Sequence, residues 1–345
     1  MKTDKTFIDL FCGAGGMSYG FEMAGFRPVL AIDNWQDALD TYMHNNPEGT
    51  TLCADLSVID VRKVALEFGI KKVDLIIGGP PCQGFSVAGK RIVDDIRNKL
   101  YKSFVSFVEF FSPEMFVMEN VPNILSIGGG IVCEAILADF RALGYNVKYK
   151  VLMASDYGVP QNRRRAIFVG SKSGDFEFPV PSVKNKVTTC QALSDLPDYS
   201  VKNGSQYEES EQSDYQKWAR SKSNGVYNHE ITVHNEKTQH IISLVPDGGN
   251  YRDLPEEYRS TRKVHIAWTR LNSQKPSITI DTGHRHHFHY CFNRIPTVRE
   301  CARLQSFPDE YVFLKSKTSQ YRQVGNAVPP LMAAAIAEEV KKTLK

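Results

Sequence analysis

The chain has 345 residues, of which 42% are hydrophobic and 23% charged, and its formal net charge at pH 7 is +3. This composition is typical of a globular protein with one large core and a smaller domain. No apolar stretch reaches the roughly 18 residues that a membrane-spanning helix needs, and the N-terminal sequence runs directly into a strand-like segment, so we expect neither membrane insertion nor secretion. The seven cysteines include no C-x-x-C pair, which argues against a disulfide framework or a four-thiolate zinc site and favours a reducing cytoplasm.

Charge is distributed unevenly along the chain. Residues 171–230 contain seven Lys or Arg and nine Asp or Glu. Residues 231–307 contain eleven Lys or Arg and seven Asp or Glu, together with seven of the chain's nine histidines. Affinity for a polyanion, if the protein has any, is expected in residues 231–307. An uneven surface charge without such a function explains the counts equally well.

Short apolar runs alternate with helical patterns over the first 170 residues. The runs lie at 6–10, 29–32, 73–77 and 115–118, and this alternation predicts an α/β fold around a mostly parallel, doubly wound sheet. Two further strand-like runs between residues 145 and 170 predict an antiparallel hairpin at one edge of that sheet.

The remainder of the chain shows weaker patterns. Residues 171–230 are polar and lack periodicity, which indicates irregular structure or a domain boundary. Two prolines at 329 and 330 precede an alanine-rich segment, which predicts a C-terminal helix.

Unusual residues follow the predicted strands. They are the FCGAGG segment Phe11 to Gly16, Asp33, Asp55, the loop with Cys82, and the pair Glu119 and Asn120. Ligands of open α/β sheets bind beyond the carboxyl ends of the strands. The agreement of these residues on one edge therefore predicts a single active site.

The glycine loop indicates the kind of cofactor. A dinucleotide fingerprint needs a glycine at position 18, where this chain has serine, so a phosphate-binding loop is disfavoured. Gly13, Gly15 and Gly16 still allow close approach of a nucleoside, and the Asp33 carboxylate suits two ribose hydroxyls. A nucleoside with an amino-acid tail, S-adenosylmethionine, fits better than NAD, although the loop alone is equally compatible with a simple tight turn.

Residues 78–86 read GGPPCQGFS and place Cys82 in a stiff turn after an apolar run. In isolation, such a cysteine is more often a buried core residue. Taken with other motifs in order along the chain, however, the sequence resembles the cytosine-C5 DNA methyltransferases of bacterial type. The motifs that carry the resemblance are FCGAGG, Asp33, Asp55, GGPPCQGFS, MENV (118–121), QNRRR (161–165), PTVRECARLQSFP (296–308) and QVGNAVPP (323–330).

The resemblance implies a mechanism in which Cys82 is the nucleophile. C5 of cytosine is a poor nucleophile until a thiolate adds to C6 and makes C5 an enamine carbon. Glu119 matches the family's carboxylic acid, which hydrogen-bonds N3 and the 4-amino group. Arg163 and Arg165 match the family's positions beside the nucleophile and beside the cytosine O2, respectively. Asn120 is expected to order the loop and not to react.

The same resemblance implies a cofactor site for S-adenosylmethionine, with S-adenosylhomocysteine as the product. Phe11 is expected on the adenine, Asp33 on the ribose, Asp55 on the adenine amino group, and Asn326 near the methionine tail. The complete set of implied cofactor residues is Phe11, Gly13, Gly15, Gly16, Asp33, Asn34, Asp55, Leu56, Pro80, Leu100, Asn326 and Ala327.

The implied substrate is double-stranded DNA. Because C5 and C6 are stacked inside a duplex, the target base must be flipped into the pocket. Residues 86–100 are expected to form a loop that closes over DNA, although an ordinary exposed loop has the same composition. The DNA contacts expected from the resemblance are Ser86, Lys90, Arg91, Arg97 and Gln161.

The segment GHRHHFH (283–289) is rich in histidine. On a strand, His284 and His286 share one face, and His287 and His289 share the other. We expect DNA contact or strand packing here, and no metal.

Three other functions compete with this interpretation. An amino-methyltransferase needs an aromatic residue after a D/N/S-P-P turn, where this chain has Cys82. A tRNA-methylating relative carries a cysteine-phenylalanine-threonine signature, whereas Cys291 and Phe292 are followed here by Asn293. A catalytically silent DNA-binding module is disfavoured by the intact Cys82, Glu119 and Arg163.

The predicted organisation is a discontinuous catalytic domain, residues 1–180 and 305–345, with the S-adenosylmethionine-dependent methyltransferase fold. Residues 181–304 form a smaller target-recognition domain. We expect a cytoplasmic monomer, with a cognate restriction endonuclease that acts on the same site without forming a stable complex.

Overall fold

The computed structural model describes residues 5–81, 98–259, 268–283 and 287–344. The chain divides into two compact units. The first comprises residues 1–153, 164–180 and 332–345, and the second comprises residues 154–163 and 181–331.

The first unit is built around a seven-stranded sheet of order β3-β2-β1-β4-β5-β7-β6. Its strands are β1 (Thr6–Leu10), β2 (Arg27–Asp33), β3 (Thr51–Cys53), β4 (Leu75–Gly78), β5 (Met115–Asn120), β6 (Asn146–Met153) and β7 (Arg164–Ser171). Strands β1 to β5 pair in parallel, whereas β7 is antiparallel to both β5 and β6. The predicted α/β class, with a parallel sheet and an antiparallel hairpin at its edge, is confirmed.

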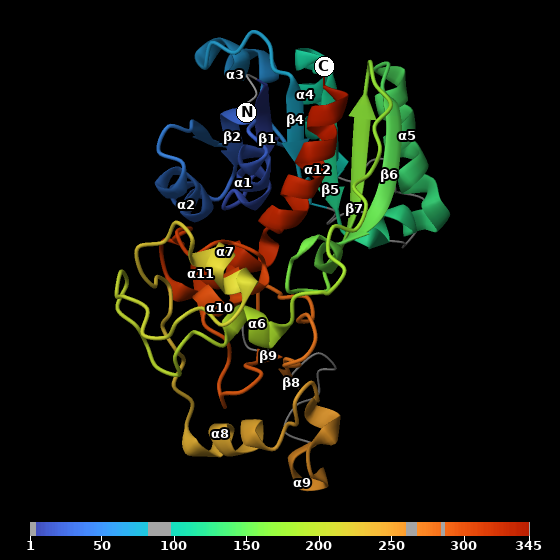
Figure 1. Cartoon of the computed structure of the whole chain (residues 1–345). Helices are drawn as coiled ribbons and strands as arrows, with labels where there is room; N and C mark the ends of the chain where they lie inside the picture. Colours follow the sequence, from blue (N-terminus) through green and yellow to red (C-terminus); the bar gives the residue numbers. More distant parts are fainter. Residues whose placement is uncertain (1–4, 82–97, 260–267, 284–286, 345) are drawn as a thin grey trace. The chain divides into compact units, whose positions relative to one another are not determined.

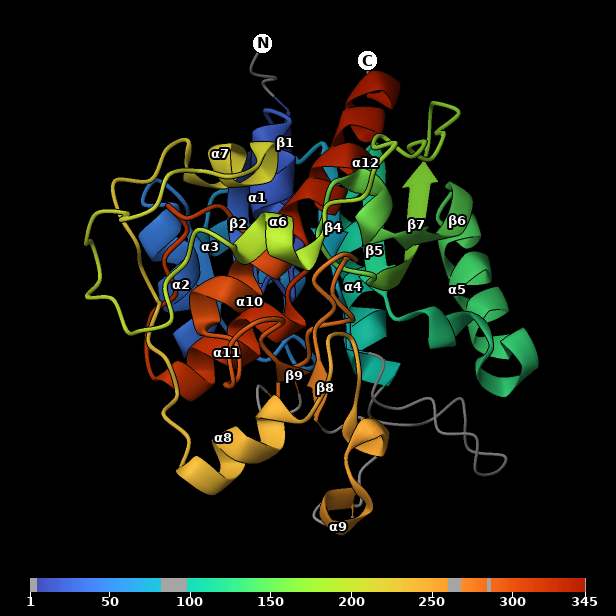
Figure 2. The same cartoon turned by 60° about the horizontal axis from the view of Figure 1, so that its bottom comes forward.

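Helices cover both faces of this sheet (Figures 1 and 2). One large core cluster joins alternate residues of the strands to α3 (Val61–Glu67), α4 (Asn98–Phe111) and α5 (Ile131–Ala142). The opposite face carries α1 (Gly16–Met23), whose Phe21 contacts Phe7 of β1, and α2 (Gln36–Asn45), whose Leu39 and Tyr42 pack on Ala31 of β2. The short helices η1 (Pro122–Leu125) and η2 (Ile127–Gly130) connect β5 to α5.

The C-terminal helix α12 (Pro330–Thr343) enters the first unit at Met332. The Lys341 ammonium donates to the carbonyl of Ala24 at the end of α1, over 2.7 Å. The last part of the chain therefore lies beside its beginning, where Figure 1 shows α12 in red next to the blue N-terminal elements.

The second unit has little regular structure for its length. Its described helices are η3 (Ala154–Tyr157), α6 (Thr189–Leu193), α7 (Asp214–Arg220), α8 (Glu236–Ser243), η4 (Tyr251–Asp253), α9 (Glu256–Arg259), α10 (Val298–Leu304) and α11 (Lys317–Asn326). Two short strands, β8 (Thr269–Arg270) and β9 (His287–Phe288), pair in parallel. The polar stretch 171–230, predicted to be irregular, thus includes α6 and α7 among long connections.

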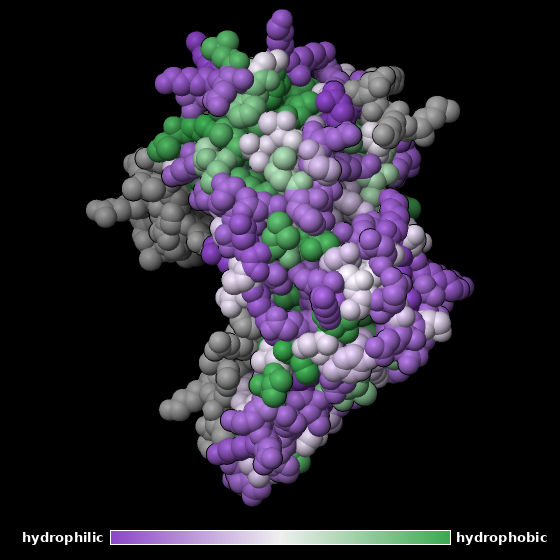
Figure 3. All heavy atoms as spheres, turned by 90° about the vertical axis from the view of Figure 1, so that its left-hand side faces the viewer, coloured by the Kyte–Doolittle hydropathy of each residue, from purple (hydrophilic) through white to green (hydrophobic). Residues whose placement is uncertain are grey.

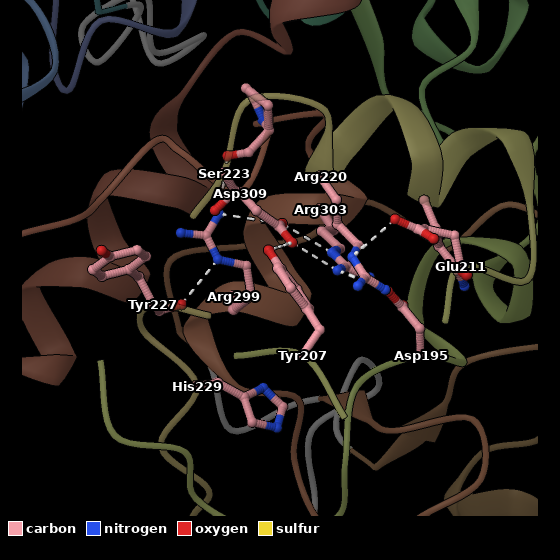
Figure 4. A network of polar contacts seen from close by, with 12 residues as sticks. Asp195, Tyr207, Glu211, Arg220, Ser223, Tyr227, His229, Arg299, Arg303 and Asp309 are labelled. Carbon is pink, nitrogen blue, oxygen red and sulfur yellow. Dashed lines mark hydrogen bonds and ion pairs between the residues drawn. The ribbon is translucent and has the colours of Figure 1, made fainter. Parts of the chain in front are cut away.

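A buried ionic network holds the second unit together (Figure 4). Arg303 of α10 lies between Asp195 and Asp309, and all three side chains have no exposed surface. The guanidinium donates to both Asp309 oxygens at 2.9 and 2.7 Å, and it also pairs with Asp195. Tyr207 donates to Asp309 at 2.6 Å, and the Arg220 guanidinium lies over the Tyr207 ring. Arg303 holds the pKa of Asp309 below its usual range despite burial, so the Asp309 carboxylate stays paired with the cation.

Arg270 is a second buried cation of this unit, and its described partners are neutral oxygens. Its guanidinium donates to the carbonyls of Ile242 and Val245 at the end of α8, to those of His289 and Phe292, and to the side chain of Asn293. The end of a helix carries partial negative charge from its free carbonyls. Arg270 therefore fixes α8 to the turn that follows β9.

The surface on the side of α2 and α3 is mixed (Figure 3). Hydrophobic residues form green areas among hydrophilic ones near α3, where Val58 and Leu66 are among the most exposed apolar side chains. No helix in the described part of the chain combines the length and apolarity needed to cross a membrane.

The described units do not follow the predicted domain boundaries at every point. Residues 305–331 were expected in the catalytic domain, and they group here with the second compact unit. The reason is packing, because Arg303 and Asp309 tie this stretch to Asp195. The functional domain boundaries stay a prediction.

Candidate active site

The loops that carry the predicted site residues of the first unit emerge from one edge of the sheet. In the parallel register, Leu10 of β1 pairs with Ile32 and Gly78, Asp33 pairs with Cys53, and Gly78 pairs with Met118. The carboxyl ends of β1 to β5 are therefore level with one another. This edge is where ligands of open α/β sheets bind.

The FCGAGG loop has the backbone of a tight strand-to-helix turn. Gly13 and Gly15 have φ values of 53° and 85°, in the left-handed region that glycine tolerates, and Phe11 also has a positive φ of 60°. Gly15 is the residue that caps the start of α1. A Cβ atom built on Gly13 would meet no other atom within 4 Å, so the loop presents bare backbone to open space.

Asp33 stabilises this loop from the end of β2. One carboxylate oxygen accepts the Gly13 N–H and the other accepts the Trp35 N–H, both at 2.9 Å. A carboxylate oxygen can accept more than one hydrogen bond, so these contacts are compatible with an added hydroxyl donor. Asp55 is exposed, and hydrogen bonds from Ser57 lower the pKa of its carboxyl. Open loop backbone beside two carboxylates fits the nucleoside part of S-adenosylmethionine.

The remaining predicted cofactor residues of this unit differ in exposure. Asn34 is exposed, Leu56 is buried, and Leu100 of α4 is half-buried against the large core cluster. Pro80 is buried, and its carbonyl accepts the Asn120 side-chain amide at 2.9 Å. Asn120 therefore holds the Gly-Gly-Pro-Pro turn against the end of β5, as expected for a residue that orders the loop.

The two glycines of this turn allow close approach of neighbouring groups. A Cβ atom on Gly78 would lie 2.2 Å from the backbone oxygen of Leu10, and one on Gly79 would lie 3.0 Å from the Glu119 carboxylate. The turn is thus packed directly against Glu119. Cys82, Ser86, Lys90, Arg91 and Arg97 lie outside the described residues.

Glu119 and Arg165 form an ion pair. The Arg165 Nε lies 2.5 Å from the Glu119 Oε1, and both side chains retain 13% exposure. The two residues come from adjacent antiparallel strands, since Glu119 of β5 pairs with Ile167 of β7. A carboxyl group oriented by a guanidinium, partly open to solvent beside the turn that leads to Cys82, is an arrangement able to hydrogen-bond a heterocyclic base.

The other predicted site residues belong to the second unit. Arg163 is buried and donates to the carbonyls of Ile280 at 3.1 Å and Gly325 at 2.9 Å. Gly325 needs its missing side chain, because a Cβ there would lie 2.4 Å from the Asp281 oxygen. Asn326 is exposed and Ala327 half-buried at the end of α11. Arg163 thus orders the segment that carries these two residues.

The structure does not support the predicted DNA contact of Gln161. Its side chain has no exposed surface, and its amide donates to the carbonyl of Leu304 and the side chain of Gln305. Its oxygen accepts the Ile280 N–H at 2.9 Å. Both ends of this amide are occupied inside the second unit, so we assign Gln161 a packing role.

The described histidines of the 283–289 segment are also internal. His287 and His289 are buried, and the His289 Nδ1 accepts the N–H groups of Cys291 and Phe292. Burial lowers the pKa of His289 to about 4, so the ring is neutral at pH 7 and packs within the unit. His284 and His286 lie outside the described residues, and the described ones contain no group of three His, Cys, Asp or Glu that suits a metal ion.

One buried residue of the first unit was not anticipated. Asp9 is 1% exposed on the inner strand β1, and its carboxyl group accepts the Ser18 hydroxyl at 2.6 Å. The signal in the sequence was an acidic residue inside the otherwise apolar run TFIDL, since carboxylates are rarely buried without a specific partner.

Comparison with known proteins agrees with this fold. A prophage-encoded DNA modification methyltransferase from Escherichia coli superposes with a TM-score of 0.83 at 29% identity, covering 99% of both chains. The model of the C-5 cytosine-specific DNA methylase family matches residues 5–342, and the chain belongs to this family. It is therefore an enzyme, a DNA (cytosine-5-)-methyltransferase.

Individual relatives match over nearly the full chain. The Type II methyltransferase M1.HphI of Haemophilus parahaemolyticus is 42% identical over 98% of this chain and 87% of its own. The Type II methyltransferase M.DdeI of Desulfomicrobium norvegicum is 38% identical over 96% of this chain and 88% of its own. The methyltransferase EhMeth of Entamoeba histolytica, with a TM-score of 0.70 at 14% identity, shares the fold.

Proposed function

We propose that this enzyme methylates C5 of a flipped cytosine within a specific duplex DNA sequence, through a covalent adduct of Cys82 with C6. The observation that carries the proposal is the Glu119–Arg165 ion pair, packed against Gly79 in the turn that leads to Cys82. S-adenosylmethionine, when bound, supplies an electrophilic methyl group on a sulfonium. The open glycine loop with Asp33 and Asp55 supports binding of its nucleoside.

Each residue has a distinct task in the proposed chemistry. The Cys82 thiolate forms a bond to C6, and the electron pair of the C5=C6 double bond becomes available at C5. Glu119 hydrogen-bonds the N3 and 4-amino side of the ring, where charge develops, and Arg165 holds Glu119 in place and faces O2. After C5 has gained its methyl group, loss of the C5 proton to a base and elimination of the thiolate restore the double bond.

Residues 181–304, which lie within the second unit, are the proposed target-recognition domain. Residues 231–307 carry the excess of basic residues over acidic ones, but Arg270, Arg294, Arg299 and Arg303 of this stretch are buried. Only exposed basic side chains attract the phosphate backbone, so the proposal rests on the position of this domain between the catalytic motifs and not on the charge count. The relatives named as Type II methyltransferases support a role in a restriction-modification system. We further propose that the enzyme acts in the cytoplasm, as a monomer that forms no stable complex with the endonuclease.

The test is methylation of defined substrates by the purified full chain. We expect isotopically methyl-labelled S-adenosylmethionine to yield labelled 5-methyldeoxycytidine in unmethylated genomic DNA, and sequencing of that DNA to give the target site. Cys82→Ala should abolish the label while cofactor affinity is retained. The matched control is Cys53→Ala, which removes an exposed thiol of the same unit and should leave turnover unchanged.

Other results would contradict the proposal in distinct ways. The same assay is run with tRNA in place of DNA, and label confined to ribocytidine of the tRNA would assign the enzyme to an RNA substrate. Label in DNA with Cys82→Ala would refute the nucleophile, and absence of label in either nucleic acid would indicate a silent binding module.

A further inference from the structure

A chain of buried polar side chains lies directly beneath the cofactor loop. Tyr42 of α2 donates to the Ser18 hydroxyl at 3.0 Å, and Ser18 of α1 donates to Asp9 of β1 at 2.6 Å. None of the three side chains is more than 2% exposed. The chemistry proposed above uses none of them.

The network is attached to the loop at both ends. Asp9 lies two residues before Phe11, where the loop begins, and Ser18 lies in the first turn of α1, three residues after Gly15 caps the helix. The hydrogen bond between Asp9 and Ser18 therefore closes the base of the glycine loop. Any change in the charge of Asp9 acts on the loop at short range.

The charged groups around Asp9 are negative. Those that act on it are Asp33, at the end of β2, and Glu22, on α1. The other titratable groups that face Asp9 are Cys12 in the loop and Tyr42 on α2. On the neighbouring strands β2 and β4, Asp9 pairs in register with the apolar Ala31 and Ile77.

This environment favours the neutral form of the Asp9 carboxyl. Burial raises its pKa to about 8, and Asp33 and Glu22 act in the same direction, whereas the hydrogen bond from Ser18 lowers it. Burial also raises the pKa of Glu22 to about 7. A positive charge bound nearby would have the opposite effect, since cations stabilise the ionised form of a carboxyl.

We propose that Asp9 is a charge-sensing positioning residue, which releases its proton to solvent when a cationic cofactor binds the loop above it. The inference rests on the proposed cofactor. S-adenosylmethionine carries a sulfonium charge that its thioether product, S-adenosylhomocysteine, lacks. Ionised Asp9 therefore favours binding of the cofactor over binding of the product.

The direction of the pH dependence follows from linkage. A ligand whose binding releases a proton binds more tightly as the pH rises. The affinity ratio of S-adenosylmethionine to S-adenosylhomocysteine should therefore rise with pH up to about pH 8, the pKa of Asp9 in the unbound protein, by at most about tenfold per pH unit, and level off above it. The amino groups of the free ligands titrate in the same range, so the comparison must be made against a variant.

The experiment is isothermal titration calorimetry of both ligands with the full chain, in buffers of different ionisation enthalpy, which counts protons released on binding. We expect wild type to release up to about half a proton more than Asp9→Asn on binding S-adenosylmethionine near pH 8, where about half of the Asp9 carboxyl groups are already ionised before binding. With S-adenosylhomocysteine the two proteins should agree. Glu67→Gln, which removes an exposed carboxylate on α3, should behave as wild type.

Each alternative outcome has a clear meaning. Equal proton counts for wild type and Asp9→Asn, with both ligands bound, would overturn the role of Asp9 and leave the proposed cofactor standing. If folded wild type binds neither ligand, the proposed cofactor fails and this inference with it. If Asp9→Asn does not fold, Tyr42→Phe replaces it as the test variant. Loss of the Tyr42 hydroxyl weakens the hydrogen bond from Ser18 to Asp9, so proton release should move to higher pH. Proton release with the same pH dependence as wild type would refute the proposal.

Discussion

The ion pair of Glu119 and Arg165 joins two strands that are adjacent in the sheet but distant in the chain. Glu119 lies one residue before the end of β5 and Arg165 one residue after the start of β7. The antiparallel pairing of these strands brings the two side chains to 2.5 Å. Arg presents a planar donor that fixes the plane of a carboxyl group. The pair is therefore a preorganised acceptor and donor site for one edge of a base.

Glu119→Gln and Arg165→Ala should each lower turnover by at least about 10²-fold, the usual contribution of a positioned acid or base. Arg165→Ala acts through the lost orientation of Glu119. The measurement is single-turnover methylation at saturating cofactor, with circular dichroism to verify folding. Lys150→Ala, an exposed cation on the neighbouring strand β6, is the control, and an equal loss there would show that the effect is general electrostatics.

At the scale of elements, the pairing of β5 with β7 depends on a missing side chain. Gly170 pairs with Phe116, and a Cβ atom on Gly170 would lie 2.0 Å from that ring. Phe116 also packs against Phe104 and Phe140 on the face covered by α4 and α5. The ring has no room to withdraw, because its other side is already occupied.

Gly170→Ala should therefore lower the free energy of unfolding by about 1–3 kcal/mol, the usual cost of overpacking a core. Phe116→Leu alone also destabilises, because it leaves a small cavity. The double variant should lose less than the sum of the two, since the smaller side chain makes room for the new methyl group. Urea unfolding of all four proteins measures this coupling, and strict additivity would argue against the clash.

At the scale of the whole molecule, the second unit depends on ion pairs between distant parts of its sequence. Asp195 lies in the polar region, whereas Arg303 and Asp309 lie in the motif-rich C-terminal region, and all are fully buried. Asp195→Asn leaves Arg303 with one fewer counter-charge in a dry site. We expect a loss of about 3–5 kcal/mol in unfolding free energy, measured by urea unfolding with a probe in the second unit.

The control for this network is an exposed pair of the same unit. Lys217 and Asp214 lie 3.1 Å apart on α7 with side chains 65% and 99% exposed, so Lys217→Ala should cost less than about 1 kcal/mol. Equal losses of unfolding free energy in Asp195→Asn and Lys217→Ala would mean that the buried Arg303 network stabilises the protein no more than an exposed ion pair does.

The local sequence pattern was sufficient to predict the strands of the first unit and the loops that follow them. The alternation of apolar runs with helical segments determines strands that bury both faces, and β1 covers the expected residues 6–10. Because parallel strands end at one edge, the residues that follow them, Asp33, Asp55 and Glu119, can be assigned to one site by their positions in the chain. The pairing of Arg165 with Glu119 depends on which strand of the hairpin lies beside β5, and only the structure shows that this strand is β7.

Only the tertiary structure decided which polar groups are buried and what they contact. Gln161 was expected to touch DNA, yet it is enclosed by Leu304 and Gln305, 143 and 144 residues further along the chain. Arg303 owes its environment to Asp195, 108 residues earlier in the chain, and Asp9 owes its own to the packing of α1 and α2 on β1. Sequence periodicity reports the face of one helix or strand, whereas burial and pKa depend on neighbours that only the folded chain brings together.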